Sequence, residues 1–187
     1  MSLMSTATGL PHGRPLTRTD LADMPEDGHR YELIDGTLIV SPAPSIRHQI
    51  VVRELMRILL PRVGEVHQLL PGPVDVVLAD DTVIQPDLLV ARAEDFTMRD
   101  LPVPPLLAIE VLSPSTRGVD LLLKRERLER AGCHHYWVVD PDEPSITAWR
   151  LGQDGRYGEP VRATGREAFS TDDPVVVGFR PADLTPS

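Results

Sequence analysis

One carboxylate in the middle of the most apolar segment constrains this chain more than any other feature. The segment at residues 106–112 reads Leu-Leu-Ala-Ile-Glu-Val-Leu, so Glu110 has apolar residues on both sides. Such runs are typical of strands that are buried on both faces of a sheet. An ionised carboxylate is costly there unless a metal ion, a cation or several donors compensate its charge. We therefore expect a functional role for Glu110; the alternative is a position at a solvated end of the strand.

Length and composition are those of one globular domain. The chain has 187 residues, of which 41% are hydrophobic and 25% charged, enough for a buried core. Residues 16–187 are expected to form this domain after a disordered leader at residues 1–15, in which residues 1–3 are interpreted as a cloning remnant. No segment has the length of a membrane span or the pattern of a secretory signal, and one cysteine excludes a disulfide framework. These features predict a cytoplasmic protein with no membrane partner.

The charge balance argues against tight, unaided binding to nucleic acid. The formal net charge is -9 and the pI is near 5.1, whereas nucleic-acid binders are more often basic. An enzyme whose acidic residues hold metal ions is still compatible with this balance. Of the 19 cationic residues only Lys124 is a lysine. Lysine is a compact ammonium whose pKa responds to burial, so this position is a candidate for function, although codon bias would also leave one lysine by chance.

The pattern of strands and helices predicts an α/β fold with a mixed central β-sheet flanked by helices. An Asp-Gly turn at residues 35–36 predicts a hairpin over residues 31–40. Strands are also expected at residues 74–78, 83–90, 106–112, 136–139, 146–151 and 175–177. Helices are expected at residues 16–24, at residues 46–60, where Pro61 ends the helix, and at residues 119–131, which Gly132 closes.

A second carboxylate, Asp87, lies in another apolar strand directly after Pro86. Proline inside a strand marks an edge, a bulge or a kink, and a bulge beside an active site can redirect a side chain. Pro-Asp alone is common in turns, so the argument depends on the pairing of Asp87 with Glu110. Two carboxylates on adjacent strands can bind one divalent cation, and oxygen ligands favour Mg²⁺ or Mn²⁺ over zinc.

Three further residues are candidates for the same site. Lys124 falls on the apolar stripe of its predicted helix, which favours either a catalytic cation or a structural ion pair with Asp120 one turn earlier. Glu32 lies on an apolar face of the hairpin, opposite Ile39, although a solvated position fits equally well. His48 heads the apolar stripe of the helix at residues 46–60 and is an auxiliary candidate; a lone histidine there is more often a core residue.

These residues together resemble the PD-(D/E)XK restriction-endonuclease-like superfamily. Glu32, Pro86-Asp87 and Glu110 occur in the order of its motifs. More specifically, the chain is similar to one bacterial family, found in cyanobacteria and actinobacteria. The similar segments are Tyr-Glu-Leu-Ile-Asp-Gly at residues 31–36 and Glu-Val-Leu-Ser-Pro-Ser-Thr at residues 110–116, together with the spacing of Asp120 and Lys124. Tyr-Trp-Val-Val-Asp at residues 136–140 is similar as well, so the resemblance extends from about residue 16 to residue 151.

The resemblance implies a metal-dependent endonuclease that hydrolyses phosphodiester bonds, with DNA as the expected substrate. It implies Mg²⁺ or Mn²⁺ at Asp87 and Glu110, assistance from Glu32, and catalysis by Lys124. The superfamily places its lysine two residues after the second acidic residue, where this chain has Leu112. Lys124 on the following helix is therefore interpreted as its replacement. Leu128 departs from the aromatic residue expected one turn later. Many nucleases of this fold cut as pairs, so a homodimer is also expected.

Two alternatives stay open at the level of sequence. The acidic net charge favours a non-cleaving module that binds nucleic acid or protein on the same fold. A hydrolase of a small phosphoester would not need a basic groove. A positive rim of Arg47, Arg53, Arg57 and Arg117 around the carboxylates would favour a polynucleotide substrate, and an acidic rim would argue against it.

Overall fold

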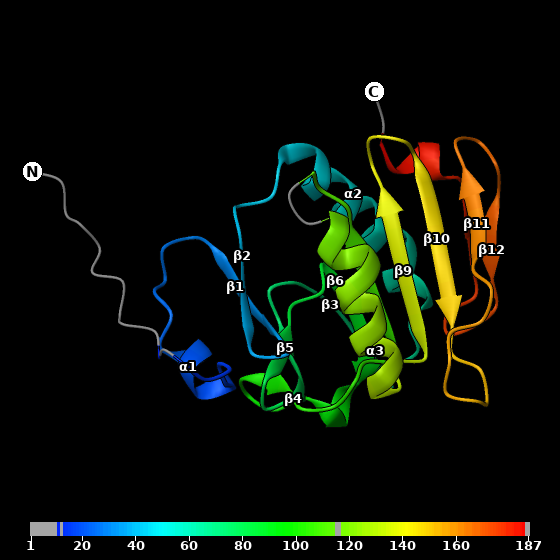
Figure 1. The fold of residues 1–187 in the computed structure, drawn as a ribbon. Helices are drawn as coiled ribbons and strands as arrows, with labels where there is room; N and C mark the ends of the chain where they lie inside the picture. Colours follow the sequence, from blue (N-terminus) through cyan, green and yellow to red (C-terminus); the bar gives the residue numbers. More distant parts are fainter. Residues whose placement is uncertain (1–10, 12, 115–116, 186–187) are drawn as a thin grey trace, which may run out of the picture.

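The strands of this chain divide into two mixed sheets (Figure 1). The computed structural model describes residue 11, residues 13–114 and residues 117–185. Its strands are β1 (Arg30–Ile34), β2 (Thr37–Ser41), β3 (His67–Pro71), β4 (Asp75–Ala79), β5 (Thr82–Ile84), β6 (Leu88–Arg92), β7 (Asp100–Leu101), β8 (Leu107–Val111), β9 (His135–Asp140), β10 (Ser145–Arg150), β11 (Val161–Thr164), β12 (Phe169–Thr171) and β13 (Val177–Phe179). One sheet has the order β2-β1-β5-β4-β7, the second has the order β11-β10-β9-β8-β6-β3, and β12 and β13 form a separate ribbon.

Few helices accompany these sheets. The α-helices are α1 (Arg18–Ala22), α2 (Ile46–Leu59) and α3 (Arg125–Ala131), and a π-helix, η3 (Val119–Lys124), leads directly into α3. Short 3-10 turns occupy η1 (Leu60–Arg62), η2 (Ala93–Asp95) and η4 (Pro181–Leu184). The predicted α/β class is therefore confirmed. In the part of the chain that the structure describes, no helix is both long and apolar enough to cross a membrane.

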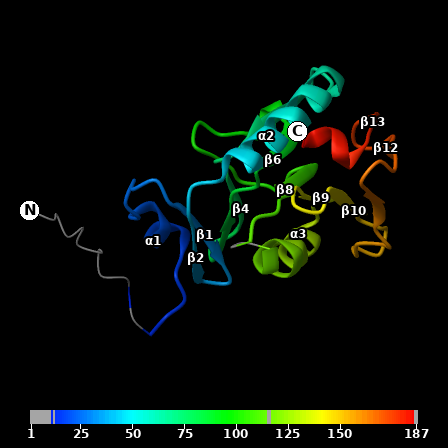
Figure 2. The same ribbon diagram turned by 90° about the horizontal axis from the view of Figure 1, so that it is seen from above.

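The six-stranded sheet separates two parts of the hydrophobic core. Alternation along β8 directs Leu107, Ile109 and Val111 to one face, where they pack with Val51 and Leu55 of α2. The opposite face carries Ala108 and lies under α3 and the five-stranded sheet. Figure 2 shows α2 and α3 on opposite sides of the six-stranded sheet. By the same alternation, Glu110 belongs to the face that α3 covers.

One predicted strand is wrong in a way that matters for function. Residues 83–90 do not form one strand, because β5 ends at Ile84 in the five-stranded sheet and β6 begins at Leu88 in the six-stranded sheet. The intervening residues 85–87 carry the chain from one sheet to the other. Pro86 has no N–H for a ladder, which is compatible with a break at this point. Asp87 therefore lies at the junction of the two sheets.

Most other predicted elements are confirmed with small shifts. The hairpin turns at Asp35 and Gly36, both with positive φ (51° and 71°), and Glu32 pairs with Ile39 as expected. Gly132 closes α3 in the left-handed conformation. The strand expected at residues 175–177 is displaced to β13, and β3 and β11 were not predicted. Of the leader expected at residues 1–15, residues 1–10 and 12 lie outside the described residues.

Candidate active site

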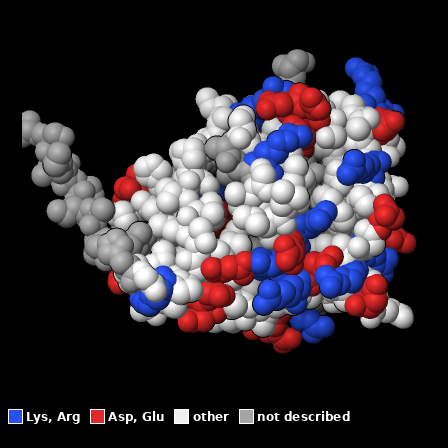
Figure 3. Space-filling model, in the orientation of Figure 1, with Lys and Arg blue, Asp and Glu red and all other residues white. Residues whose placement is uncertain are grey.

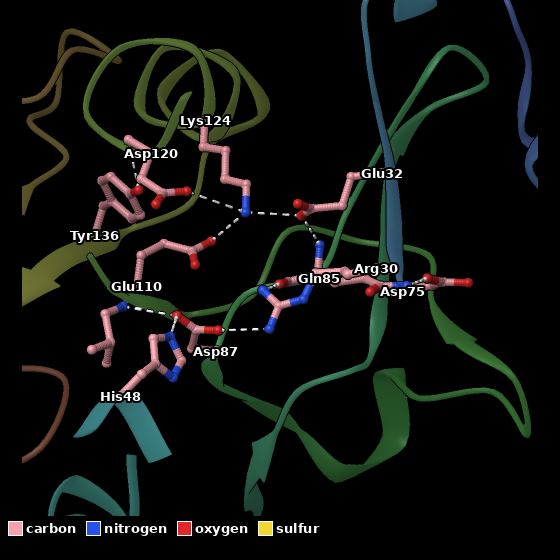
Figure 4. A network of polar contacts seen from close by, with 11 residues as sticks. Arg30, Glu32, His48, Asp75, Gln85, Asp87, Glu110, Asp120, Lys124 and Tyr136 are labelled. Atoms are coloured by element: carbon pink, nitrogen blue, oxygen red, sulfur yellow. Dashed lines mark hydrogen bonds and ion pairs between the residues drawn. The ribbon is translucent and has the colours of Figure 1, made fainter. Parts of the chain in front are cut away.

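The predicted site residues meet at the junction of the two sheets, beside a cavity of about 360 Å³. Asp87, Glu110, Asp120, Lys124 and His48 all line this cavity. Figure 4 shows them as one network of polar contacts, which also includes Glu32. The six residues come from β1, α2, the 85–87 connection, β8 and η3. The fold therefore brings together every candidate residue that the sequence singled out.

Glu110 and Lys124 form the centre of this network. Glu110 is 1% exposed on β8, and its Oε1 atom lies 3.0 Å from Nζ of Lys124, which is also 1% exposed. The ammonium is 2.8 Å from Oε1 of Glu32 and 3.4 Å from Oδ1 of Asp120. The solvated alternatives for Glu110 and Glu32 are therefore excluded. Lys124 also has the predicted inward direction, and Leu112, at the usual position of the lysine, belongs to the apolar core.

The π-helix η3 gives Lys124 its position. A π-helix is wider than an α-helix, since its hydrogen bonds join residues i and i+5, and such segments are frequent at functional sites. Asp120 and Lys124 both face the site, while the intervening Leu122 is 62% exposed. The hydroxyl of Tyr136 on β9 donates to the carbonyl oxygen of Asp120 at 2.8 Å. This bond ties the π-helix to the six-stranded sheet at the level of the site.

Glu32 connects the network to the five-stranded sheet. Its Oε1 atom accepts a hydrogen bond of 2.6 Å from the backbone N–H of Gln85, in addition to the ion pair with Lys124. The side-chain Nε2 of Gln85 donates to Oδ1 of Asp75 at 2.7 Å. Glu32 is thus held by the ammonium and by the connection that carries Asp87.

Asp87 is held from three sides. Its Oδ1 atom accepts from the guanidinium of Arg30 at 2.8 Å, and Oδ2 contacts Nε2 of His48 and accepts from the backbone N–H of Val111, both at 2.9 Å. The Val111 bond places the carboxylate beside Glu110, as the prediction of adjacent strands requires. Burial opposes ionisation of Asp87, but His48, Arg30 and Val111 together hold its pKa below the usual value.

The site contains more carboxylates than cations. Glu32, Asp87, Glu110 and Asp120 face the cations Lys124 and Arg30. Burial raises the pKa of Glu110 well above its usual value, and the neighbouring carboxylates raise it further while Lys124 opposes the shift. Burial lowers the pKa of Lys124, but the attraction of Glu110, Glu32 and Asp120 outweighs it and raises the pKa overall. A divalent cation would favour the ionised form of these carboxyl groups and offset their excess over Lys124 and Arg30.

This donor set fits a hard divalent cation bound by few protein ligands. Among the described residues, no group of three or more His, Cys, Asp or Glu side chains is arranged to hold a metal ion. Mg²⁺ keeps several waters and is usually bound by one or two carboxylates together with substrate phosphate. Asp87 and Glu110 are the two carboxylates that could serve in this way, because Glu32 and Asp120 approach Lys124 from its other sides.

Three residues that the sequence reasoning missed support the site. Arg30 contacts Asp87 and donates to the carbonyl oxygen of Gln85 at 3.1 Å. Gln85 contacts Glu32, and Gly72 donates its N–H to the carbonyl oxygen of Asp87 at 2.9 Å. A Cβ atom on Gly72 would lie 2.6 Å from the carbonyl oxygen of Pro86. Gln85 could have been found from the sequence, because it directly precedes Pro86-Asp87. No feature of the sequence marks Arg30 or Gly72 as part of the site.

The four arginines of the expected rim are all engaged in ion pairs, two of them with the same carboxylate. Arg53 and Arg57 lie 2.7 and 2.8 Å from the Glu54 carboxylate, and Arg117 lies 2.5 Å from Asp140. Of the four arginines only Arg47 lines the cavity, 3.4 Å from Asp142. Positive and negative side chains also intermingle on the face shown in Figure 3. The described surface thus offers neither the positive rim nor a uniformly acidic one.

Comparison with known proteins identifies a family and solved structures of the same fold. The model of the Uma2 family, described as "Putative restriction endonuclease", matches residues 18–185. A crystal structure described as that of a putative nuclease belonging to DUF820 from Anabaena variabilis ATCC 29413 has a TM-score of 0.74 at 19% identity. The match covers 91% of this chain and 98% of that one, which shows a common fold. No curated protein matches the sequence.

Proposed function

This chain belongs to the Uma2 family of restriction-endonuclease-like proteins, and on that premise we propose that it is an endonuclease that hydrolyses DNA with Mg²⁺ or Mn²⁺. Glu32, Asp87, Glu110 and Lys124 are its catalytic residues, Asp87 and Glu110 its metal ligands, and His48 and Asp120 its auxiliary residues. The Anabaena variabilis protein of the same fold is described as a putative nuclease, which supports the same activity.

A single observation carries this proposal: in the network of polar contacts beside the cavity, the four carboxyl groups of Glu32, Asp87, Glu110 and Asp120 converge on the cations Lys124 and Arg30. Burying this much negative charge is costly, and a purely structural site would be more stable with fewer acidic groups. The excess has a physical reason if the site accepts a divalent cation. Lys124 reaches Glu110 from η3, so the cation of the motif is supplied from a helix rather than from the strand of Glu110.

The residues divide the work of phosphodiester hydrolysis. Asp87 and Glu110 would hold a divalent ion, which would supply Lewis-acid activation of the phosphate and of a water molecule. Lys124 offers a fixed positive charge beside the place where negative charge develops, and Glu32 and Asp120 orient its ammonium. Arg30 and His48 hold the Asp87 carboxylate in one orientation through its two oxygens.

The test is cleavage of supercoiled plasmid and of single-stranded DNA with Mg²⁺ or Mn²⁺. We expect the parent to cleave, Glu110→Gln and Asp87→Asn to be inactive, and Lys124→Met to be slower by on the order of 10²–10³-fold. Glu54→Gln is the matched control, because Glu54 is also buried but pairs with Arg53 and Arg57 away from the cavity. Cleavage by Glu110→Gln at the parental rate would refute the proposal.

The ion-paired rim favours a non-cleaving module that binds protein as a second candidate. Arg117 pairs with Asp140, and Arg53 and Arg57 share Glu54, which reduces the positive charge that they offer to a DNA backbone. If no DNA is cleaved under any metal condition and no oligonucleotide is retained, this second candidate replaces the first. A homodimer is proposed from the resemblance, and sedimentation of the protein with and without DNA tests it.

A further inference from the structure

A second cavity, of about 600 Å³, adjoins the site. The two cavities share Arg30 and the segment at residues 42–44, which connects β2 to α2. In Figure 4, Asp75 and Gln85, which line the second cavity, lie on the far side of the Arg30 guanidinium from Asp87. A chain-like substrate with a phosphate at Asp87 and Glu110 would therefore have its neighbouring unit at the second cavity.

The wall of the second cavity is unsuited to a phosphate. Arg30 is its one lysine or arginine among the described lining residues, and that guanidinium is already bonded to Asp87 and to the carbonyl oxygen of Gln85. Glu26 and Asp75, which also line the cavity, carry negative charge. A phosphate would meet no uncommitted cation here and would be repelled by the two carboxylates.

The same wall is suited to a flat, partly apolar group. It contains the ring of Tyr31, which is half-buried, together with Met24 and Pro73. The hydroxyl of Tyr31 donates to Asp27 at 2.8 Å, and the ring of His29 lies edge-on with 6.3 Å between the two ring centroids. Aromatic rings of this kind stack with bases of single-stranded nucleic acid irrespective of sequence.

We propose that the second cavity binds an unstacked nucleobase next to the cleaved bond, with Tyr31 as its stacking platform, and that the preferred substrate is therefore a single strand. A base inside a duplex is stacked and paired, so it can enter such a cavity only after it is flipped out at a cost. Tyr31 acts here as a specificity-determining residue, and the inference rests on the proposed function.

The experiment measures binding of the full chain to a fluorescein-labelled 15-nucleotide DNA strand and to its duplex. Fluorescence anisotropy is read with Ca²⁺ in place of Mg²⁺, and gels check that the strand stays intact. We expect the parent to bind the strand at least about tenfold more tightly than the duplex. Tyr31→Ala should lose about tenfold in affinity for the strand, whereas Tyr31→Phe, which keeps the ring, should bind like the parent.

An abasic nucleotide placed at each position in turn tests the contact without relying on a variant. One position should weaken binding to the parent by about tenfold and have no effect on Tyr31→Ala. Tyr31→Leu, which keeps apolar bulk without a ring, replaces Tyr31→Ala if thermal unfolding shows that the latter is not folded. Equal or tighter binding of the duplex, or an abasic scan without a sensitive position, overturns the inference.

Cleavage assays with Mg²⁺ separate this inference from the proposed function. If the parent cleaves DNA but Tyr31→Ala binds and cleaves single strands as the parent does, the base site is refuted and the nuclease stands. If binding depends on Tyr31 and no DNA is cleaved, the nuclease is refuted and the base site stands.

Discussion

Replacement of Lys124 by methionine should show how much of the fold depends on one buried charge. The ammonium lies 2.8 Å from Glu32, 3.0 Å from Glu110 and 3.4 Å from Asp120, and water has almost no access to it. Methionine keeps similar bulk but leaves these carboxylates without their common partner. Removing one member of a buried ion pair costs roughly 3–5 kcal/mol in the free energy of unfolding.

That loss is a large share of the stability of an ordinary domain. The free energy of unfolding of a native domain is about 5–15 kcal/mol. For a chain of this size, each kcal/mol lost from it lowers the melting temperature by about 2–4 °C. We therefore expect Lys124→Met to melt roughly 6–20 °C below the parent. The free energy can be measured by equilibrium urea unfolding, followed by the fluorescence of the buried Trp137 and Trp149.

Two further variants make this measurement specific. Arg166→Met removes an exposed cation for which no ion pair is found among the described residues, and it should change the free energy of unfolding by less than about 0.5 kcal/mol. The double variant Lys124→Met with Glu110→Gln should recover part of the loss, because it also removes one of the stranded negative charges. A loss below about 1 kcal/mol in Lys124→Met would contradict the buried ion network.

Three further predictions concern groups around or away from the site. Gly72→Ala should cost roughly 1–3 kcal/mol of stability and lower nuclease activity, because its Cβ would meet a backbone carbonyl at 2.6 Å; Gly64→Ala, with no neighbour within 4 Å, should be silent in urea unfolding and cleavage assays. Burial raises the pKa of Cys133 to about 12, so the thiol should resist a disulfide reagent at pH 8 in the native protein and react only at the rate of unfolding; prompt reaction would contradict its burial. Burial also lowers the pKa of His135, so the folded state binds fewer protons than the unfolded state. The resulting stability is present above the unfolded pKa of about 6.5 and is lost as the pH falls below it, so His135→Gln should flatten the decline between about pH 7 and pH 5 in urea titrations.

The candidate site could be assembled from the sequence because its signals are local. Glu110 is conspicuous in an apolar run, and Lys124 is the one lysine and falls on an apolar stripe. The hairpin of Glu32 follows from its Asp-Gly turn. These signals indicate burial of a charge, which is rare without a compensating partner. The pairings of Asp87 with Glu110 and of Lys124 with Asp120 follow from the residues, whereas the roles of these residues in catalysis come from the resemblance and remain predictions.

The arrangement of the strands could not be read from the sequence in the same way. Residues 83–90 have the composition of one buried strand, and only long-range pairing decides that β5 joins β1 and β4 while β6 joins β3 and β8. The contact of Arg30 with Asp87 spans 57 residues and depends on that division. The π-helix was equally hidden, because nothing in the sequence of residues 119–124 distinguishes a π-helix from the first turns of an α-helix.

Because the site lies between the two sheets, its residues also hold the sheets together. Glu32 belongs to the five-stranded sheet and Glu110 to the six-stranded sheet, and both contact the same ammonium. A ligand that displaces either carboxylate from Lys124 also removes an ion pair that holds the two sheets together. Amide hydrogen exchange along β1 and β8 would register such loosening far from any cleaved bond. Binding of a ligand at the site and the stability of the contact between the two sheets are therefore expected to change together.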